Sequence, residues 1–258
     1  MTQSDKARAF AALHKPGAPV VLFNVWDVGG AKALEAAGAP AIATGSHGIA
    51  GAMGYGDGEQ IPLDEVLYLV RRITASVAVP VTVDFEGAYA LDPASVTANV
   101  TRLIGAGAIG LNFEDQVIGT KTLHAPETQA ARIAAIHAAG VATDVPLFIN
   151  ARTDVFLKAP ADQHAGLVPE ALARAAIYAA AGASGLFVPG LVDPGLMAAV
   201  VQGTPLPVNA MASPTQQPAS VLANLGVARI SHGPFPWYAA MAALVDGWRA
   251  ATKHQVGF

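Results

Sequence analysis

The sequence predicts one (β/α)8 barrel that spans residues 1–258 as a single domain. Eight short apolar runs alternate with stretches of helical pattern, and 258 residues is an ordinary length for this fold. Most of the runs lack apolar–polar alternation, as expected for parallel strands buried on both faces. The triplet Ala-Gly-Ala follows three helical stretches, at 37–39, 106–108 and 181–183, and Gly226 holds the same place after a fourth. The recurrence of glycine after these helical stretches indicates a repeated βα unit in which glycine ends each helix.

The predicted strands are four to six residues long and lie at 19–24, 41–44, 79–84, 109–114, 147–151, 185–188, 207–210 and 228–231. Apolar spacings of three and four residues, with Pro, Ser, Thr or Asp near several starts, predict helices between them. These helices cover 64–76, 95–104, 128–138, 169–180, 194–201 and 220–225. An open, doubly wound sheet is the alternative architecture. It is disfavoured because no G-x-G-x-x-G follows the first strand, where Gly29-Gly30 lacks the rest of that motif.

Two further segments carry separate predictions. The polar stretch 160–169 is expected to be a loop inserted after the fifth strand. Residues 236–253, with Trp237 and Trp248, form an amphipathic final helix. This helix either packs on the barrel or is exchanged between the subunits of a homo-oligomer, and the sequence does not choose between them.

The composition excludes several classes of function. Hydrophobic residues make up 53% and charged residues 13%, about half the usual ~25%, which argues for a large core and against disorder. A net charge of −4 argues against a nucleic-acid partner. No apolar run reaches the roughly 18 residues of a membrane helix, and residues 1–15 lack a secretory pattern, so we expect a cytoplasmic protein with no membrane partner. The absence of cysteine excludes disulfides, thiolate metal sites and a cysteine nucleophile or acid.

Polar side chains gather where the predicted strands end, which is where a barrel places its active site. Three pairs of residues are separated by two positions: Asp84 and Glu86, Asn112 and Glu114, Asn150 and Arg152. The period of a strand places both members of each pair on one face, which can be the barrel interior.

Converging carboxylates repel one another unless a cation lies among them. A hard cation with oxygen ligands, Mg²⁺ or alternatively Mn²⁺, satisfies this requirement. Arg152 then suits a substrate carboxylate or phosphonate, which its planar fork can bind through two hydrogen bonds. The alternative is that these charged residues form buried salt bridges that only stabilise the barrel.

Six short motifs occur in a characteristic order and spacing. They are Asn24-Val25-Trp26-Asp27, Gly54-Tyr55-Gly56-Asp57-Gly58, Val83-Asp84-Phe85-Glu86-Gly87, Asn112-Phe113-Glu114-Asp115-Gln116, Asn150-Ala151-Arg152-Thr153-Asp154 and Phe187-Val188-Pro189-Gly190. Together they resemble the isocitrate lyase / phosphoenolpyruvate mutase superfamily, from Asn24 to the last strand. The resemblance implies a (β/α)8 barrel, Mg²⁺, a small 2-oxo or 2-hydroxy acid as substrate, and a homo-oligomer, dimeric or tetrameric.

The resemblance also implies roles for individual residues. Asp84 is similar to the direct Mg²⁺ ligand, and Glu86 and Glu114 to ligands that act through water. Arg152 resembles the clamp on the substrate carboxylate, and Asp57 the carboxylate beside the reacting bond. The turn Gly45-Ser46-His47 resembles the loop that holds substrate oxygens with backbone N–H groups and a serine.

The chain departs from the superfamily pattern in three places. Where D-x-D-x-G-Y-G is usual, this chain has Asp84-Phe85-Glu86-Gly87-Ala88-Tyr89-Ala90. The lyase branch carries a cysteine acid in its lid, and the mutase lid an asparagine near 121–122; neither is present here. His124, in the same lid segment, is the candidate proton donor, with an ordinary solvated loop histidine as the alternative.

Four more residues are candidates for substrate binding because of their place at strand ends. They are Trp26, Asp27, Asn209 and His232. Trp26 could equally belong to the core, and His47 could equally pack within its turn.

The leading interpretation is an Mg²⁺-dependent enzyme that cleaves a C–C bond, or less readily a C–P bond, in a small 2-oxo or 2-hydroxy acid through an enolate. Decarboxylation or hydrolysis of an oxaloacetate-like substrate suits a site without a cysteine acid. The alternatives are a non-catalytic binder of 2-oxo acids, an enzyme of the phosphonopyruvate mutase or hydrolase type, and a barrel of another family. The last would need a strand-end lysine or a Gly-rich phosphate turn, and neither is found.

Overall fold

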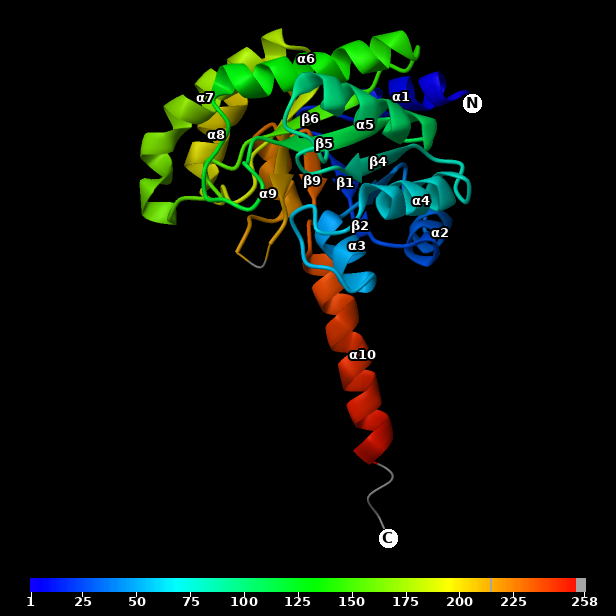
Figure 1. The fold of residues 1–258 in the computed structure, drawn as a ribbon. Coiled ribbons are helices and arrows are strands. Elements are labelled where there is room, and N and C mark those ends of the chain that lie inside the picture. Colours follow the sequence, from blue (N-terminus) through cyan, green and yellow to red (C-terminus); the bar gives the residue numbers. More distant parts are fainter. Residues whose placement is uncertain (214, 254–258) are drawn as a thin grey trace.

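The computed structural model describes residues 1–213 and 215–253, and in this part of the chain nine parallel strands close into a barrel (Figure 1). The strands are β1 (Val20–Leu22), β2 (Asn24–Val25), β3 (Ile42–Thr44), β4 (Val81–Asp84), β5 (Gly110–Glu114), β6 (Phe148–Arg152), β7 (Gly185–Phe187), β8 (Val208–Met211) and β9 (Arg229–Ser231). β1 pairs with β9 and β2 pairs with β3, so the two are halves of one strand that closes the barrel. The eight predicted strands and the (β/α)8 fold are therefore confirmed, with the first strand interrupted at Phe23.

The helices follow the strands in the expected alternation, except that two helices lie between β3 and β4. The helices are α1 (Gln3–Ala12), α2 (Val28–Ala36), α3 (Ser46–Ala52), α4 (Leu63–Thr74), α5 (Pro93–Gly105), α6 (Pro126–Ala142), the 3-10 turn η1 (Ala161–Gln163), α7 (His164–Ala180), α8 (Pro194–Gly203), α9 (Ala219–Asn224) and α10 (Phe235–Lys253). The first of the two helices between β3 and β4, α3, was not predicted, and it begins at Ser46 within the turn expected at 45–47. The glycines at 38, 107, 182 and 226 all have positive φ, between 88° and 101°, and so end their helices in the left-handed conformation predicted for them.

The prediction of a polar loop at 160–169 is wrong for its second half. α7 begins at His164 and continues through Pro169. His164 and Val168 are buried, and His164 packs edge-on against Phe156. Proline at the sixth position of the helix removes one backbone hydrogen bond, and this burial offsets the loss.

α1 was not predicted, and it covers the amino-terminal end of the barrel. A reciprocal capping box between Thr2 and Asp5 starts the helix. Its buried Phe10 lies edge-on to Phe148 at the start of β6, with 5.4 Å between ring centroids. This packing leaves the opposite end of the barrel, where the strands finish, as the open end.

α10 leaves the barrel after β9 and projects away from it (Figure 1). Leu244, Val245 and Trp248 are 44–68% exposed along it, although they are large and apolar. Val21 and Phe23 on the first strand are also nearly half exposed. No helix in the described part of the chain has the length and apolar character needed to cross a membrane.

Candidate active site

Two adjoining cavities open at the carboxyl ends of the strands. One is about 240 Å³ and is lined by residues that include Asn24, Asp84 and Asn112. The other is about 280 Å³ and includes Glu86 and Glu114. Both are bounded by Ser46, Asp57 and Arg152, so the two lie side by side around these three residues. Predicted strand-end residues from several strands therefore meet around a space suited to a small ligand.

The carboxylate of Asp84, at the end of β4, is held by three donors. The backbone N–H and the hydroxyl of Ser46 both donate to Oδ2, over 3.1 and 2.9 Å. The amide of Asn112 donates to Oδ1 over 3.2 Å. The backbone N–H of Asp84 in turn donates to Thr44 Oγ1 over 3.1 Å. Asp84 is thus fixed by the neighbouring strands β3 and β5 and by the start of α3.

Glu86 lies in the loop after β4, which has an unusual backbone. Glu86, Ala88 and Tyr89 have φ values of 49°, 62° and 55°, in the left-handed region that residues other than glycine rarely adopt. The Glu86 carboxylate accepts hydrogen bonds from the backbone N–H groups of Gly58 and Glu59, over 2.9 and 3.0 Å. This conformation, held at a functional cavity, fixes where Glu86 can point.

Two buried or half-buried side chains hold this loop, which we call the 86–90 loop. The guanidinium of Arg132 donates to the backbone oxygens of residues 87 and 90, over 2.7 and 2.8 Å. The amide of Asn99 donates to those of residues 88 and 89, over 3.0 and 3.2 Å. Glu59 accepts from the backbone N–H of Tyr89 over 2.7 Å. These bonds offset the cost of the strained backbone.

Burial raises the pKa of Glu86 to about 7, and repulsion from Asp84 and Asp57 acts in the same direction. Burial also raises the pKa of Glu114, against the attraction of Arg152. The charged forms of these carboxyl groups are therefore disfavoured by burial and by mutual repulsion, and a cation among them would stabilise those charged forms.

Arg152 is the guanidinium of the site, and protein carboxylates already engage it. Its Nη1 lies 2.8 Å from Glu114 Oε2. Its Nε and Nη2 donate to the two oxygens of Asp154, over 2.6 and 2.9 Å. A guanidinium has five N–H donors, so three are used and one remains on each terminal nitrogen. Those two donors are what Arg152 can offer to a bound acid.

His47 and Asp57 form a pair at the edge of the smaller cavity, with 3.5 Å between Nδ1 and Oδ2. The His47 ring packs edge-on against Tyr238 of α10, with centroids 5.0 Å apart. This histidine is therefore placed beside the space that a ligand would occupy.

Five of the predicted site residues are not among those that line the two cavities: Trp26, Asp27, His124, Asn209 and His232. Asp27 caps α2 by accepting from the N–H of Gly30 over 2.6 Å. Trp26 packs edge-on against Trp237. Both residues were assigned from their place at a strand end, yet both serve helix packing.

His124 is held through its backbone, which donates to Asp115 and accepts from Arg174. Burial lowers the pKa of its imidazole, and Arg132 adds to this effect. His232 donates its backbone N–H to Asn24 Oδ1, and its ring contacts Phe23 in a tilted arrangement. Asn209 is buried and donates to Ser231 Oγ over 3.0 Å.

The structure adds residues that sequence reasoning missed. Leu157, Met211 and Tyr238 complete the wall of the smaller cavity, and Glu59 and Arg132 support the 86–90 loop. No sequence signal marks them, because each reaches the site through the packing of separate elements. Asn112 and Ser231, at the ends of predicted strands, also line the cavity.

The donor set fits Mg²⁺ bound largely through water. In the described part of the chain no group of three His, Cys, Asp or Glu side chains is arranged to hold a metal ion directly. Mg²⁺ commonly takes one or two protein carboxylates and keeps several waters. Asp84 would be the direct ligand, and Glu86 and Glu114, with their buried and mutually repelling carboxylates, would bind its waters.

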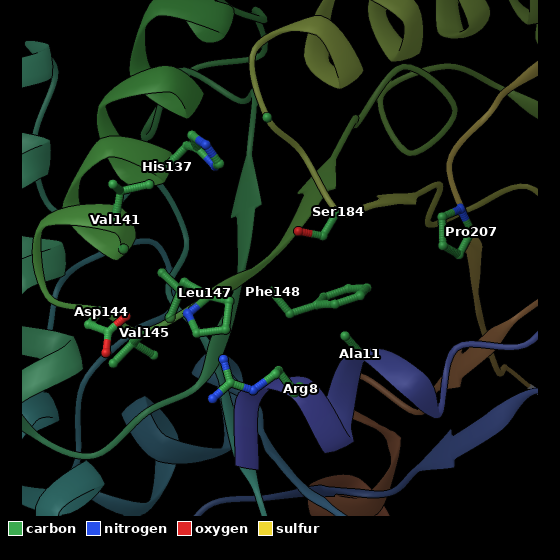
Figure 2. A pocket seen from close by; sticks show the side chains of 13 residues that line it. Arg8, Ala11, His137, Val141, Asp144, Val145, Leu147, Phe148, Ser184 and Pro207 are labelled. Atoms are coloured by element: carbon green, nitrogen blue, oxygen red, sulfur yellow. The ribbon is translucent and has the colours of Figure 1, made fainter. Parts of the chain in front are cut away.

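A further cavity, of about 590 Å³, lies at the amino-terminal ends of the strands (Figure 2). Arg8, His137 and Asp144 are the titratable side chains along it. It contains none of the predicted site residues. Because barrel chemistry occurs at the carboxyl ends, we assign the functional site to the two smaller cavities.

The fold and these cavities define a class: (β/α)8 proteins with an acidic site and one guanidinium at the carboxyl ends of the strands. Comparison with known proteins identifies the group within that class. Residues 10–252 match the phosphoenolpyruvate phosphomutase family. The chain belongs to this family, within the isocitrate lyase / phosphoenolpyruvate mutase superfamily.

Relatives of known name support this placement. A crystal structure from Burkholderia cenocepacia J2315, described provisionally as a phosphonomutase, is 45% identical, with a TM-score of 0.93 and coverage of 99% of this chain and 100% of that one. The 2-methylisocitrate lyase of Escherichia coli K12 is 32% identical over 72% of this chain and 63% of its own length. An oxaloacetate decarboxylase of Rhodopseudomonas palustris BisB18 is 30% identical over 74% and 65%. The chain thus spans slightly less than two thirds of these two enzymes.

A phosphonopyruvate hydrolase solved with oxalate and Mg²⁺ has a TM-score of 0.83, with coverage of 98% of this chain and 88% of that one, and is 23% identical. At this identity the likeness shows the shared fold. Relatives in the superfamily thus act on C–C or C–P bonds of small acids.

Proposed function

We propose that this chain is an Mg²⁺-dependent enzyme that cleaves a C–C bond in a small 2-oxo or 2-hydroxy acid, by decarboxylation or hydrolysis of an oxaloacetate-like substrate. The observation that carries the proposal is the smaller cavity, which brings Asp84, Ser46 and Arg152 around about 240 Å³. That volume lies below the usual ~300–1,000 Å³ of drug-sized sites and suits a four- or five-carbon acid.

Different residues of the cavities would bind the substrate, hold the metal ion and orient the substrate oxygens. The two free donors of Arg152 would bind a carboxylate of the substrate. Asp84 would hold Mg²⁺ directly, with Glu86 and Glu114 on its waters. When bound, Mg²⁺ would supply positive charge beside the 2-oxo group and so favour the transition state for enolate formation. The backbone N–H groups near Ser46 and its hydroxyl would orient substrate oxygens.

In decarboxylation, cleavage of the C–C bond releases carbon dioxide and leaves the electron pair on the pyruvate-like fragment as an enolate, whose carbon then takes a proton. In hydrolysis, water adds to the 2-oxo carbon, and the electron pair of the broken bond leaves on the acetate-like fragment, whose carbon takes the proton. Among the histidines of the described chain, His47 is the one that lines the cavity. We assign His47 as the donor of this proton. Asp57 would orient the imidazole ring, and solvent would protonate His47 again after each turnover. His124, the candidate from the sequence, is less suited because it lies outside the lining of both cavities.

Turnover against a panel of 2-oxo and 2-hydroxy dicarboxylates and phosphonopyruvate tests the proposal, with whole product mixtures followed by NMR. We expect one dicarboxylate to be consumed in the presence of Mg²⁺, and the rate to be lost with chelator and in Asp84→Ala. Glu127→Gln, which removes an exposed carboxylate on α6, is the matched control and should keep full activity.

The other outcomes identify the alternatives. Consumption of phosphonopyruvate alone would establish C–P cleavage, towards which the phosphonomutase likeness points. Thermal stabilisation by one panel member without turnover would establish a binder. Turnover that survives both the chelator and Asp84→Ala would contradict the assigned metal site.

A further inference from the structure

A buried cation lies inside the barrel beneath the candidate site. Arg229, the first residue of β9, is 1% exposed, and its guanidinium carbon lies 6.0 Å from the centre of the Phe10 ring. Its Nη2 donates to Asn112 Oδ1 over 3.0 Å, and its Nε donates to Ser231 Oγ over 3.2 Å. Both partners are uncharged side chains that line the smaller cavity.

Burial lowers the pKa of Arg229 to about 9, while the negative charge of Asp84 opposes this effect. The guanidinium therefore remains charged at neutral pH. Within the described residues Arg229 forms no ion pair, and the carboxylate that interacts with it electrostatically is that of Asp84. A buried charge without a close partner destabilises a fold, which suggests that Arg229 serves another purpose.

The amide of Asn112 connects the two charged groups. Its Oδ1 accepts from Arg229 and also from Asn150 Nδ2, over 3.0 and 2.9 Å. The Asn150 amide carries both a donor and an acceptor and could pair with either face of Asn112, whereas a guanidinium has only donors. Arg229 is therefore the partner that forces Asn112 to present its oxygen inward. The Nδ2 group must then face outward, where it donates to Asp84 Oδ1 over 3.2 Å.

We propose that Arg229 is a positioning residue for the metal ligand Asp84, and that it acts through Asn112 by fixing which way that amide faces. The inference rests on the proposed function in one respect, the assignment of Asp84 to the metal. Without Arg229, Asn112 could rotate and present its oxygen to Asp84, so that an acceptor would face a carboxylate. Asp84 would then lose one of the three donors that orient it.

A merely structural role for Arg229 makes a different prediction. If it only fills the barrel interior, its replacement should change stability and leave metal affinity unaltered. If it acts through Asn112, its replacement should weaken metal binding, and the effect should disappear once Asn112 has been removed.

The test is a double-mutant cycle on metal affinity, measured without substrate by the EPR signal of free Mn²⁺. Arg229→Met fills similar space and removes an unpaired buried charge, so we expect it to fold. We expect its Kd for Mn²⁺ to rise about tenfold or more, the usual effect of losing a partner of a metal ligand. Asn112→Ala should weaken binding at least as much, and the double variant should be no weaker than Asn112→Ala alone.

Two further variants complete the experiment. Leu222→Ala truncates a buried side chain on α9 that lines neither cavity of the site, and it should lower the Tm while leaving the Kd unchanged. Arg229→Lys keeps a charged donor and should recover part of the lost affinity. It also provides the comparison if Arg229→Met does not fold.

The outcomes separate the two proposals. Equal Kd values for the wild type and both Arg229 variants would overturn the positioning role and leave the metal site intact. Additive losses in the double variant would overturn the route through Asn112. If the wild-type chain does not bind Mn²⁺, the proposed metal site fails and the role of Arg229 fails with it.

Discussion

Ser46 donates two hydrogen bonds to a single oxygen of Asp84, one from its backbone N–H and one from its hydroxyl. The first residue of α3 is thereby joined to the last residue of β4. Ser46→Ala keeps the backbone donor and removes the other. We expect Asp84 to be less well oriented and the Mg²⁺ concentration for half-maximal activity to rise about 10- to 100-fold. Kinetics at varied Mg²⁺ measure this; Ser76→Ala, a surface serine at the end of α4, should match the wild type.

The two candidate proton donors can be separated directly. His47 lines the cavity and pairs with Asp57, whereas His124 does not line it. We expect His47→Gln to lower kcat by roughly 10²–10⁴, the usual contribution of a general acid, with little change in KM. His124→Gln should change kcat by less than about threefold. The reverse order of effects in steady-state kinetics would restore His124 as the donor.

Arg132 lines neither cavity, but it should affect catalysis through the 86–90 loop that it holds. It holds the backbone oxygens of residues 87 and 90, so Arg132→Met leaves one buried and one half-buried carbonyl without this donor. We expect urea unfolding to show a loss of about 1–3 kcal/mol, the usual penalty for such groups. We also expect kcat to fall, because Glu86 is no longer held in place. Unchanged kcat in a destabilised variant would show that the loop does not depend on Arg132 for its conformation.

His14 provides a pH-dependent test of the barrel's amino-terminal end. It stacks on Phe148 at 3.9 Å, and burial lowers its pKa to about 3, with Arg229 adding to the effect. The unfolded chain binds a proton there below pH ~6.5, and the folded chain does not. The free energy of unfolding should therefore decrease by up to about 1.4 kcal/mol for each pH unit from about 6.5 towards 3.

His14→Gln should make this dependence shallower. Urea melts at pH 7.5, 6.5, 5.5 and 4.5 measure the slope for each protein. His137→Gln, which replaces an exposed histidine on α6, is the control and should keep the wild-type slope. Equal slopes for wild type and His14→Gln would show that His14 is protonated as readily in the folded chain as in the unfolded one.

Apolar residues on α10 and on the first strand predict self-association. Val21 and Phe23 are nearly half exposed, and Leu244 and Trp248 are 68% and 67% exposed on the projecting helix. We expect light scattering to give the mass of a dimer or tetramer, with α10 of one copy covering apolar surface of another. Trp248→Glu should shift the mass towards the monomer, whereas Arg72→Glu on α4 should not. A monomeric wild type at micromolar concentration would contradict this prediction.

The sequence predicted the barrel well because strands buried on both faces leave short, uninterrupted apolar runs. It missed α1, whose mixed polar residues owe their helical state to a capping box and to the burial of Phe10. It treated 160–169 as a loop because proline and polar residues usually interrupt helices. In the structure, tertiary burial of His164 and Val168 outweighs that local preference.

At the site, too, residues placed by local pattern could be predicted, and residues placed by tertiary packing could not. Position at a strand end placed Asp84 and Arg152 at the cavities, because strand period and direction fix where those side chains lie. Ser46 reaches the cavities from the first turn of α3 instead. The rule did not extend to Asp27, where the backbone has already turned into α2. Tyr238 could not be found at all, since it reaches the cavity from a helix that follows the last strand.

The left-handed residues of the 86–90 loop have a consequence for laboratory evolution of this protein. Glycine at position 88 or 89 would relieve backbone strain and widen the range of conformations open to the loop. Selection for heat resistance alone favours the relief of backbone strain. Selection for turnover disfavours a more mobile loop, because the proposed role of Glu86 requires a fixed position for its carboxylate. Libraries randomised at positions 86–89 should therefore diverge under the two selections, and the divergence would show how far stability and turnover are opposed in this loop.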